Sequence, residues 1–368
     1  MLCSGEQRDE YLVMHKNENK IRLAISGAGR IGRAVFRAFF EYRERFPNID
    51  LVAINDPHDF TTLVHLLRYD SVHGRLPFTI NLQAHDCLNV MQGKSVVQLL
   101  AKREPVRLAW GDLGVDTVLE CTGVFRDKVG LSQHLQAGAK CVVLSAPAQG
   151  SVDATIVLGA NDVQLRAKHT VISIGSCTTN ALAPVLKMLQ AYVGIKQCFF
   201  TTVHAYTKDQ CLVDAHHKDL RRARAAGQSI IPTKTGAAQA ISDIFPDLSG
   251  RVQGYAVRVP TANVSLLDVV VDLVQPIDLA QIKAHIICFC RQSAYINFTN
   301  EPLVSCDFNH SLYSAIIDLS QLQVIGHTVR IVAWYDNEWA YAVRLLDLAQ
   351  IQSLLCSSTQ SEMGEQIF

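Results

Sequence analysis

The sequence lacks the apolar stretches that membrane insertion or secretion requires. No segment approaches the roughly 20 apolar residues of a membrane-spanning helix, and no apolar run follows a basic start at the N-terminus. It also lacks an excess of charge, because Lys and Arg number 34 and Asp and Glu number 34. This balance gives no overall field that would attract nucleic acid or an anionic membrane. We therefore expect a cytoplasmic protein with neither as a partner.

The cysteines lack the spacing of a metal site. The chain has 11 cysteines, which is an odd number, and it contains no C-x-x-C motif. The one C-x-C, at Cys288 and Cys290, lies in an apolar run. This pattern favours reduced, mostly buried thiols, and we predict no metal.

Apolar residues are abundant enough for two folded domains. Of 368 residues, 49% are apolar and 18% are charged, as in well-buried globular proteins. Residues 1–19 are polar and aperiodic, and residues 356–368 contain few core-forming side chains. We expect the first of these segments to be a flexible extension and the second to be a tail.

The first half alternates short β-branched runs with helical patterns. A helix is predicted over residues 31–46, between strands at 21–25 and 51–54. Further strands are predicted at 117–120, 141–145 and 171–174. Strands that alternate with helices are typical of a parallel sheet that grows by crossovers. The sequence therefore predicts an α/β, doubly wound Rossmann domain over residues 20–176.

The second half has longer strands with few helices between them. Strands are predicted at 197–204, 254–259, 265–273 and 329–335, with covering helices at 235–244 and 279–293. This texture favours an α+β catalytic domain with a mainly antiparallel sheet over residues 177–336. A last helix over residues 337–355 is expected to pack on the Rossmann domain.

A dinucleotide fingerprint lies between the first strand and the first helix. The segment Gly27-Ala28-Gly29-Arg30-Ile31-Gly32 is G-x-G-x-x-G, and Asp56 ends the next strand. Glycines permit a tight turn beside a pyrophosphate, and the acid can accept bonds from ribose hydroxyls while repelling a 2′-phosphate. NAD is the expected cofactor, and NADP stays possible because Arg30 and Arg33 could offset the acid. The predicted contacts are Gly27, Gly29, Arg30, Ile31, Gly32, Asp56, Thr122 and Ser145.

Cys177 is the candidate nucleophile. It lies where a strand ends and a helix begins, in the polar segment Gly175-Ser-Cys-Thr-Thr-Asn180. The positive end of the helix dipole and free backbone N–H groups favour a thiolate there. The alternative, a small buried residue before a helix, fits poorly with such polar neighbours. His204, at the end of a strand, is the candidate base, although a lone histidine is more often structural.

Several motifs together resemble one enzyme family. The similarity runs from about residue 21 to 348, and its motifs appear in the family's order. They are Ser176-Cys-Thr-Thr-Asn180, His204-Ala-Tyr-Thr207, Asp219-Leu-Arg-Arg-Ala-Arg-Ala-Ala226, Ile231-Pro-Thr-Lys-Thr-Gly-Ala-Ala238, Arg258-Val-Pro-Thr261 and Trp334-Tyr-Asp-Asn-Glu-Trp339. The chain resembles the phosphorylating glyceraldehyde-3-phosphate dehydrogenases.

The resemblance implies a role for each matching residue. Cys177 would form a thioester with a small phosphorylated aldehyde, and His204 would act as the base. Asn337 and Tyr341 would contact the nicotinamide. The implied contacts of substrate and inorganic phosphate are Ser176, Thr178, Thr207, Asp209, Thr235, Gly236 and Arg258. The family also implies a homotetramer in which residues 207–227 reach the cofactor of a neighbouring subunit.

Departures from the family pattern keep alternatives open. Ala215-His216 matches neither the NAD-type nor the NADP-type members, and Ala340 replaces a usual glycine. Segments near 219–232 and 302–310 resemble the sister family of erythrose-4-phosphate dehydrogenases, which pass the thioester to water. Thr207 and the pair Thr235-Gly236 favour phosphate as the acceptor instead. A nucleotide-binding protein without activity is a further alternative, against which the joint presence of Cys177, His204 and Arg258 argues.

Overall fold

The computed structural model describes residues 20–91 and 94–365, and the side chains of these up to residue 356 apart from that of residue 85. Residues 1–19, for which we predict an extension, lie outside it. The described chain divides into two compact units. The β1 unit comprises residues 20–156, 163–175 and 342–365, and the β12 unit comprises residues 157–162 and 176–341. Each chain half predicted as a domain thus corresponds to most of one unit, with two short segments exchanged.

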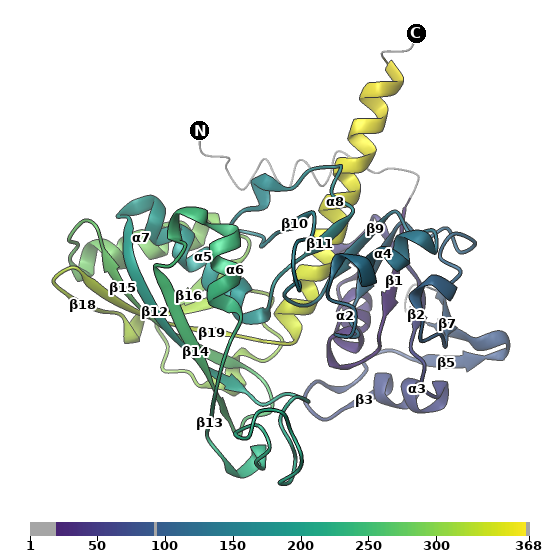
Figure 1. Cartoon of the computed structure of the whole chain (residues 1–368), viewed down its shortest axis with the longest axis horizontal. Coiled ribbons are helices and arrows are strands. Elements are labelled where there is room, and N and C mark those ends of the chain that lie inside the picture. Colours follow the sequence, from purple (N-terminus) through teal and green to yellow (C-terminus); the bar gives the residue numbers. More distant parts are fainter. Residues whose placement is uncertain (1–19, 92–93, 366–368) are drawn as a thin grey trace. The chain divides into compact units, whose positions relative to one another are not determined.

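The β1 unit is built on a mostly parallel sheet (Figure 1). Within the described residues, the strand order is β10 (Ala154–Thr155), β11 (Val171–Ser173), β9 (Cys141–Leu144), β8 (Thr117–Glu120), β1 (Ile21–Ser26), β2 (Ile49–Asn55), β7 (Ser95–Leu100), β6 (Cys87–Val90) and β5 (Ile80–Gln83). Within the described part of this sheet, only β5, β6 and β7 pair antiparallel. A two-stranded ribbon pairs β3 (Tyr69–Asp70) with β4 (Gly74–Arg75).

The β1 unit contains four of the described helices. They are α2 (Arg30–Glu41), α3 (Phe60–Arg68) and α4 (Lys128–Gln136), together with most of α8 (Trp339–Glu365). Val35 and Phe39 of α2 are buried as the periodicity predicts, whereas Ile31 is half-buried. The helix ends at Glu41 rather than at residue 46, and a 3-10 turn follows. Pro47 disfavours helical backbone at Phe46, so the predicted end at that residue was too late.

The β12 unit is built on a mainly antiparallel sheet, so the predicted fold class is confirmed. Its described strands run in the order β13 (Ile231–Thr233), β14 (Val252–Val259), β12 (Ile195–Ala205), β15 (Ser265–Leu273), β19 (Thr328–Tyr335), β17 (Ala315–Asp318) and β16 (Ile296–Thr299), with β18 (Gln323–Ile325) beside β19. The pairs β12–β14 and β16–β17 are parallel.

One face of this sheet carries the hydrophobic core. Helices α5 (Cys177–Tyr192), α6 (Ala237–Ile244) and α7 (Leu279–Gln292) cover it (Figure 1). Alternation along β12 directs Cys198 and Phe200 into the core, whereas Phe199 between them is 60% exposed on the other face. Short 3-10 turns connect the elements of both units: η1 (Arg43–Arg45), η2 (Ala84–Asp86), η4 (Pro105–Arg107), η5 (Asp162–Gln164), η6 (Ala226–Gln228), η7 (Pro246–Leu248), η8 (Ser305–Phe308) and η9 (Leu319–Gln321).

The last helix is longer than the sequence predicts. We expect a helix over 337–355 and a tail from 356, but α8 continues to Glu365. No proline or glycine occurs between Trp339 and Gly364, so no residue in this stretch favours an earlier end. Its contacts tie it to the β1 unit, where Asp347 pairs with Arg45 at 3.0 Å and Gln352 donates to the carbonyl of His169 at 2.7 Å.

Candidate active site

The glycine-rich turn links β1 to α2 in the β1 unit. Gly27 has a φ of +93°, which glycine adopts at low cost, and a Cβ there would lie 2.7 Å from the backbone nitrogen of Thr122. A Cβ at Gly32 would lie 2.0 Å from the carbonyl oxygen of Gly27. At Gly29, by contrast, no other described atom lies within 4 Å of a Cβ. Gly27 and Gly32 are therefore required for packing, whereas Gly29 leaves open space at the start of α2.

The other predicted cofactor contacts follow neighbouring parallel strands. Asp56, Thr122 and Ser145 come after β2, β8 and β9, and the sheet places these strands beside β1 in the order β9, β8, β1, β2. Connections leave β1 on one side for β2 and later return to its other side at β8, so this is the switch point at which open α/β sheets bind ligands. The Asp56 carboxylate accepts the N–H of Ala28 at 2.8 Å and thereby holds the turn.

The start of α2 suits a phosphate. Gly29 is the N-cap, and no side chain accepts a hydrogen bond there. Backbone N–H groups and the positive end of the helix dipole can therefore face an anion. Arg30 donates to Asp70 at 2.5 Å, and Arg33 donates to the carbonyl of Ala28 at 2.9 Å. Both arginines thus have partners within the protein, which weakens the case that they offset the charge of Asp56 for NADP.

The β12 unit brings Cys177 and His204 together. Cys177 is the first residue of α5, and the Ser176 hydroxyl caps the helix by accepting the N–H of Thr179 at 3.1 Å. His204 is on β12, and its Nε2 lies 3.5 Å from the sulfur of Cys177. Cys177 is half-buried, whereas His204 is buried. The nucleophile and the base are therefore within hydrogen-bonding distance.

Burial keeps both members of this pair neutral. Desolvation raises the pKa of Cys177, although the Arg258 charge and the N–H and hydroxyl of Thr178 act in the opposite direction. Desolvation, reinforced by the Arg258 charge, lowers the pKa of His204 to about 3. Burial therefore opposes the thiolate that we expect from the helix dipole.

Arg258 lies beside this pair. From β14, its Nη1 donates to the carbonyl of Ala205 at 2.9 Å and lies 2.7 Å from Nδ1 of His204. Its Nε is buried and has no hydrogen-bond partner among the described residues. A buried guanidinium nitrogen that is unsatisfied by protein atoms is a suitable donor to an anion.

A buried hydroxyl network that the sequence did not predict supports the pair. The Tyr335 hydroxyl lies 3.0 Å from the Thr178 hydroxyl and 2.7 Å from that of Thr202. Tyr335 thus links the start of α5 to β12. Ser265 extends the polar group, since its hydroxyl accepts the N–H of Ala205 at 3.1 Å and donates to Asn337 Oδ1 at 2.8 Å.

The remaining predicted residues of the β12 unit have partners of their own. Thr207 bonds to Gln210, Asp209 pairs with Arg222, and the Thr235 hydroxyl accepts the N–H of Ala237 at 3.3 Å. Gly236 is the N-cap of α6. Because Asn337 uses its side-chain oxygen on Ser265, its amide NH₂ is the group that can donate to a ligand. Tyr341, in the first turn of α8, is buried.

Comparison with known proteins assigns both halves of the chain to one enzyme family. The NAD binding domain of glyceraldehyde 3-phosphate dehydrogenase matches residues 21–128, and the C-terminal domain of the same enzyme matches residues 176–337. Glyceraldehyde-3-phosphate dehydrogenases of Cupriavidus necator (the chromosomal form), Pseudomonas aeruginosa and Geobacillus stearothermophilus are each 46% identical to this chain, covering 89% of it and 97% of the relative. The chain belongs to the glyceraldehyde-3-phosphate dehydrogenase family.

Membership in the glyceraldehyde-3-phosphate dehydrogenase family makes the protein an NAD-dependent oxidoreductase. NAD is therefore its cofactor, and the matched NAD binding domain contains the glycine turn, Asp56 and Thr122. The structure fits this cofactor, because the open position at Gly29 and the uncapped start of α2 lie together. The matched C-terminal domain contains Cys177, His204 and Arg258.

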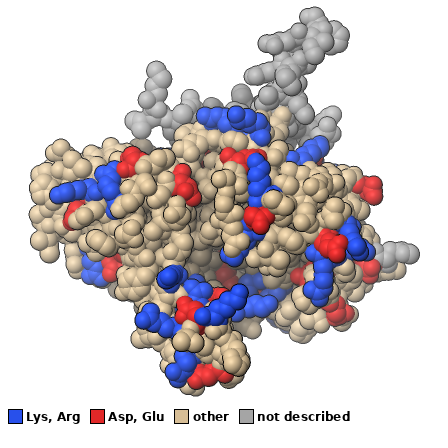
Figure 2. All heavy atoms as spheres, in the orientation of Figure 1, with Lys and Arg blue, Asp and Glu red and all other residues tan. Residues whose placement is uncertain are grey.

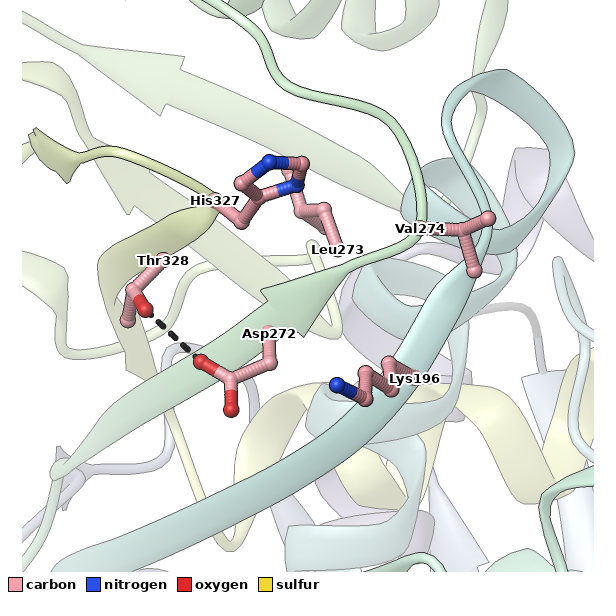
Figure 3. Close-up of a pocket in the computed structure, with 6 residues that line it drawn as sticks. All are labelled: Lys196, Asp272, Leu273, Val274, His327 and Thr328. Carbon is pink, nitrogen blue, oxygen red and sulfur yellow. Dashed lines mark hydrogen bonds between the residues drawn. The ribbon is translucent and has the colours of Figure 1, made fainter.

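A surface hollow in this family member lies apart from the predicted residues. It is lined by Lys196, Asp272, Leu273, Val274, His327 and Thr328 (Figure 3). The Asp272 carboxylate already accepts the hydroxyl of Thr328 at 2.7 Å and the amide of Gln197 at 2.6 Å. The carboxylate of the hollow therefore already has protein partners, and none of the lining residues belongs to the predicted site.

The described surface has mixed charge. On the face shown in Figure 2, acidic and basic side chains are interspersed. Within the loop that follows β12, Arg222 pairs with Asp209 and Arg224 with Asp214. Over the described residues there is no group of three or more His, Cys, Asp or Glu side chains placed to bind a metal, and no helix combines the length and apolarity needed to cross a bilayer.

Proposed function

We propose that this protein oxidises glyceraldehyde 3-phosphate to 1,3-bisphosphoglycerate, with NAD as the hydride acceptor and a thioester on Cys177. The 3.5 Å approach of the Cys177 sulfur to Nε2 of His204 carries the proposal. The relatives named above are glyceraldehyde-3-phosphate dehydrogenases by name, and this chain matches 97% of the length of each. They support the choice of substrate.

His204 moves the protons of the reaction. Because the thiol and the imidazole are both neutral, the sulfur adds to the aldehyde carbon while its proton passes through Nε2 of His204 to the carbonyl oxygen. In the next step Nε2 accepts the new hydroxyl proton as hydride leaves the carbon. NAD, when bound, supplies the hydride acceptor. The carbonyl re-forms as a thioester, which inorganic phosphate attacks, and the sulfur leaves and takes a proton back.

Arg258, Thr207 and Asp209 are proposed to hold the substrate phosphate and its neighbouring hydroxyl. The unsatisfied Nε of Arg258 supports this role. Ser176, Thr178, Thr235 and Gly236 are proposed to hold inorganic phosphate. Thr178 already bonds to Tyr335, so it would contact phosphate only through its remaining hydrogen-bonding capacity. Asn337 and Tyr341 are proposed to contact the nicotinamide, and the glycine turn, Arg30, Ile31, Asp56, Thr122 and Ser145 the rest of NAD.

A homotetramer is the proposed assembly. The face of the β12-unit sheet opposite the helices supports it, because Phe199, Tyr255 and Val270 expose large apolar surface there. Light scattering should give a mass about four times that of the 40.7 kDa chain. A monomeric mass would contradict the assembly without affecting the chemistry.

One assay tests the reaction. Cofactor reduction is followed by absorbance with glyceraldehyde 3-phosphate or erythrose 4-phosphate, with NAD or NADP, and with or without inorganic phosphate. We expect the highest kcat/KM with glyceraldehyde 3-phosphate, NAD and phosphate. Cys177→Ser should reduce kcat by about 10³-fold or more, because a serine hydroxyl stays protonated near neutral pH. Phosphate-independent oxidation of erythrose 4-phosphate at a higher rate would reject the proposed substrate.

A further inference from the structure

A buried chain of polar side chains lies behind the glycine turn of the β1 unit. It joins Trp110, His134 on α4 and Glu120 at the end of β8, and each of these three residues is 0% exposed. The indole Nε1 of Trp110 lies 3.0 Å from Nδ1 of His134, and Nε2 of His134 lies 3.0 Å from Oε2 of Glu120. The other carboxylate oxygen, Oε1, accepts the N–H of Thr122 at 2.7 Å and also its hydroxyl.

The direction of each hydrogen bond follows from chemistry. An indole N–H can only donate, so Nδ1 of His134 must accept it. The ring proton of His134 is then on Nε2 and points at Glu120. Glu120 thus accepts from His134 at one oxygen and twice from Thr122 at the other. Every group in the chain has a fixed role as donor or acceptor.

Thr122 connects this chain to the glycine turn. A Cβ on Gly27 would lie within 2.8 Å of the nitrogen, the Cα and the Cγ2 of Thr122, so the two residues are in close contact. The Thr122 hydroxyl also accepts the N–H of Val124 at 3.0 Å. Any movement of the Thr122 peptide would therefore displace Gly27 and the turn that begins there.

We infer that Glu120 and His134 are positioning residues for NAD, which fix the Thr122 peptide and through it the glycine turn. The inference rests on the nucleotide site of the β1 unit and not on the aldehyde chemistry. Both side chains act through Thr122, and their hydrogen-bond polarity, rather than their bulk alone, sets the affinity for NAD.

The variant Glu120→Gln tests whether the donor and acceptor roles of these hydrogen bonds set the affinity for NAD. The amide has nearly the shape of the carboxylate, but its NH₂ must face either the Nε2–H of His134 or the N–H of Thr122, so two donors meet in a buried place. We expect the Kd for NAD, measured by calorimetry without aldehyde, to rise about ten-fold. The kcat at saturating NAD should change less than about two-fold, because the variant leaves Cys177 and His204 intact.

A second substitution should restore binding. Trp110→Phe removes the donor to Nδ1, which frees His134 to carry its proton on Nδ1 and to accept the glutamine NH₂ at Nε2. We expect the double variant Glu120→Gln/Trp110→Phe to bind NAD within about three-fold of the wild type. Trp110→Phe alone should also change the Kd by less than three-fold. A Kd that does not respond to Glu120→Gln, or that is raised equally in the single and double variants, would overturn the inference.

His134→Gln covers the case in which Glu120→Gln does not fold, as judged by circular dichroism. It removes the imidazole that fixes the orientation of the Glu120 carboxylate and leaves every residue proposed to contact NAD in place. We expect the Kd for NAD to rise about three-fold with kcat unchanged, and an unaltered Kd would overturn the inference. Since binding is measured without substrate, a protein inactive toward glyceraldehyde 3-phosphate but normal in these titrations would reject the proposed function alone.

Discussion

The starts of α2 and α5 have the same local design and differ in one respect. In both, a strand leads through a turn with a positive-φ glycine, Gly27 or Gly175, into a helix. At α5 the Ser176 side chain caps the helix and forms a reciprocal pair with Thr179, whereas no side chain caps α2. One helix start is completed by the protein itself, and the other leaves its donors for a ligand.

This difference corresponds to what each helix start holds. A covalent nucleophile needs a fixed position, and the capping box fixes the backbone around Cys177. A reversible cofactor needs a helix start that no side chain occupies, and no side chain caps the start of α2. A helix N-terminus alone therefore does not indicate which role it has; the presence of a side-chain cap does.

The largest expected effect comes from the glycines of α2. Gly32→Ala would place a Cβ 2.0 Å from the Gly27 carbonyl oxygen, so it should destabilise the protein by about 1–3 kcal/mol and raise the Kd for NAD more than ten-fold. Gly29→Ala is the matched control, because nothing described lies within 4 Å of its Cβ. It should alter stability by less than about 0.5 kcal/mol yet still raise the Kd roughly ten-fold.

Urea unfolding and calorimetry separate these two outcomes. If Gly29→Ala changed neither stability nor the Kd, the open space at the start of α2 would have no role in binding, and the contrast with α5 would fail.

A pH dependence of intermediate size is expected from His204. Its pKa is about 3 when folded, against about 6.5 when unfolded, so between these values the unfolded chain binds a proton that the folded protein does not. Stability should therefore fall as the pH decreases from 6.5, by about 1.4 kcal/mol per pH unit for this group. Between pH 7 and pH 5, the free energy of unfolding measured with urea should fall by about 2 kcal/mol less in His204→Gln than in the wild type. Parallel stability curves for the two proteins would contradict the assignment.

The smallest effect is expected from the cap of α5. Ser176→Ala removes the acceptor for the Thr179 N–H and should cost about 1 kcal/mol. Asp278→Ala is a matched control, because Asp278 forms the same kind of capping box at the start of α7. Both variants should lose similar stability in urea. Only Ser176→Ala should change the alkylation rate of Cys177, measured on its peptide by mass spectrometry; equal rates in both variants would show that the cap does not position the thiol.

The sequence was a reliable guide wherever a pattern is local. The glycine fingerprint, the strand before it and the helix after Cys177 all depend on neighbouring residues, although we predict that helix over residues 181–191 and it begins at Cys177 itself. Tyr335 was missed because alternation along β19 places it with Val329, Ile331 and Ala333, so it has the pattern of an ordinary core residue. The contact of Cys177 with His204 spans 27 residues of sequence, and the family resemblance rather than spacing predicted it.

Burial is the part of the electrostatics that the sequence could not predict. A helix dipole can be inferred from sequence, but the desolvation of Cys177 and His204 depends on long-range packing. The same limit applies to Asp56. Its carboxylate, just after β2, accepts the N–H of Ala28 in the turn after β1, and such a long-range bond leaves no local pattern in the sequence. The placement of residues 157–162 in the β12 unit likewise has no local signal.

The discontinuity of the β1 unit affects how the chain folds during translation. Its sheet is complete once residue 175 has been made, but α8, which holds Arg45 through Asp347 and His169 through Gln352, comes from the last part of the chain. A nascent chain would have to keep the docking surface of α8 vacant while the ribosome synthesises the whole β12 unit. Synthesis of α8, rather than emergence of the first domain, should therefore complete the cofactor-binding half.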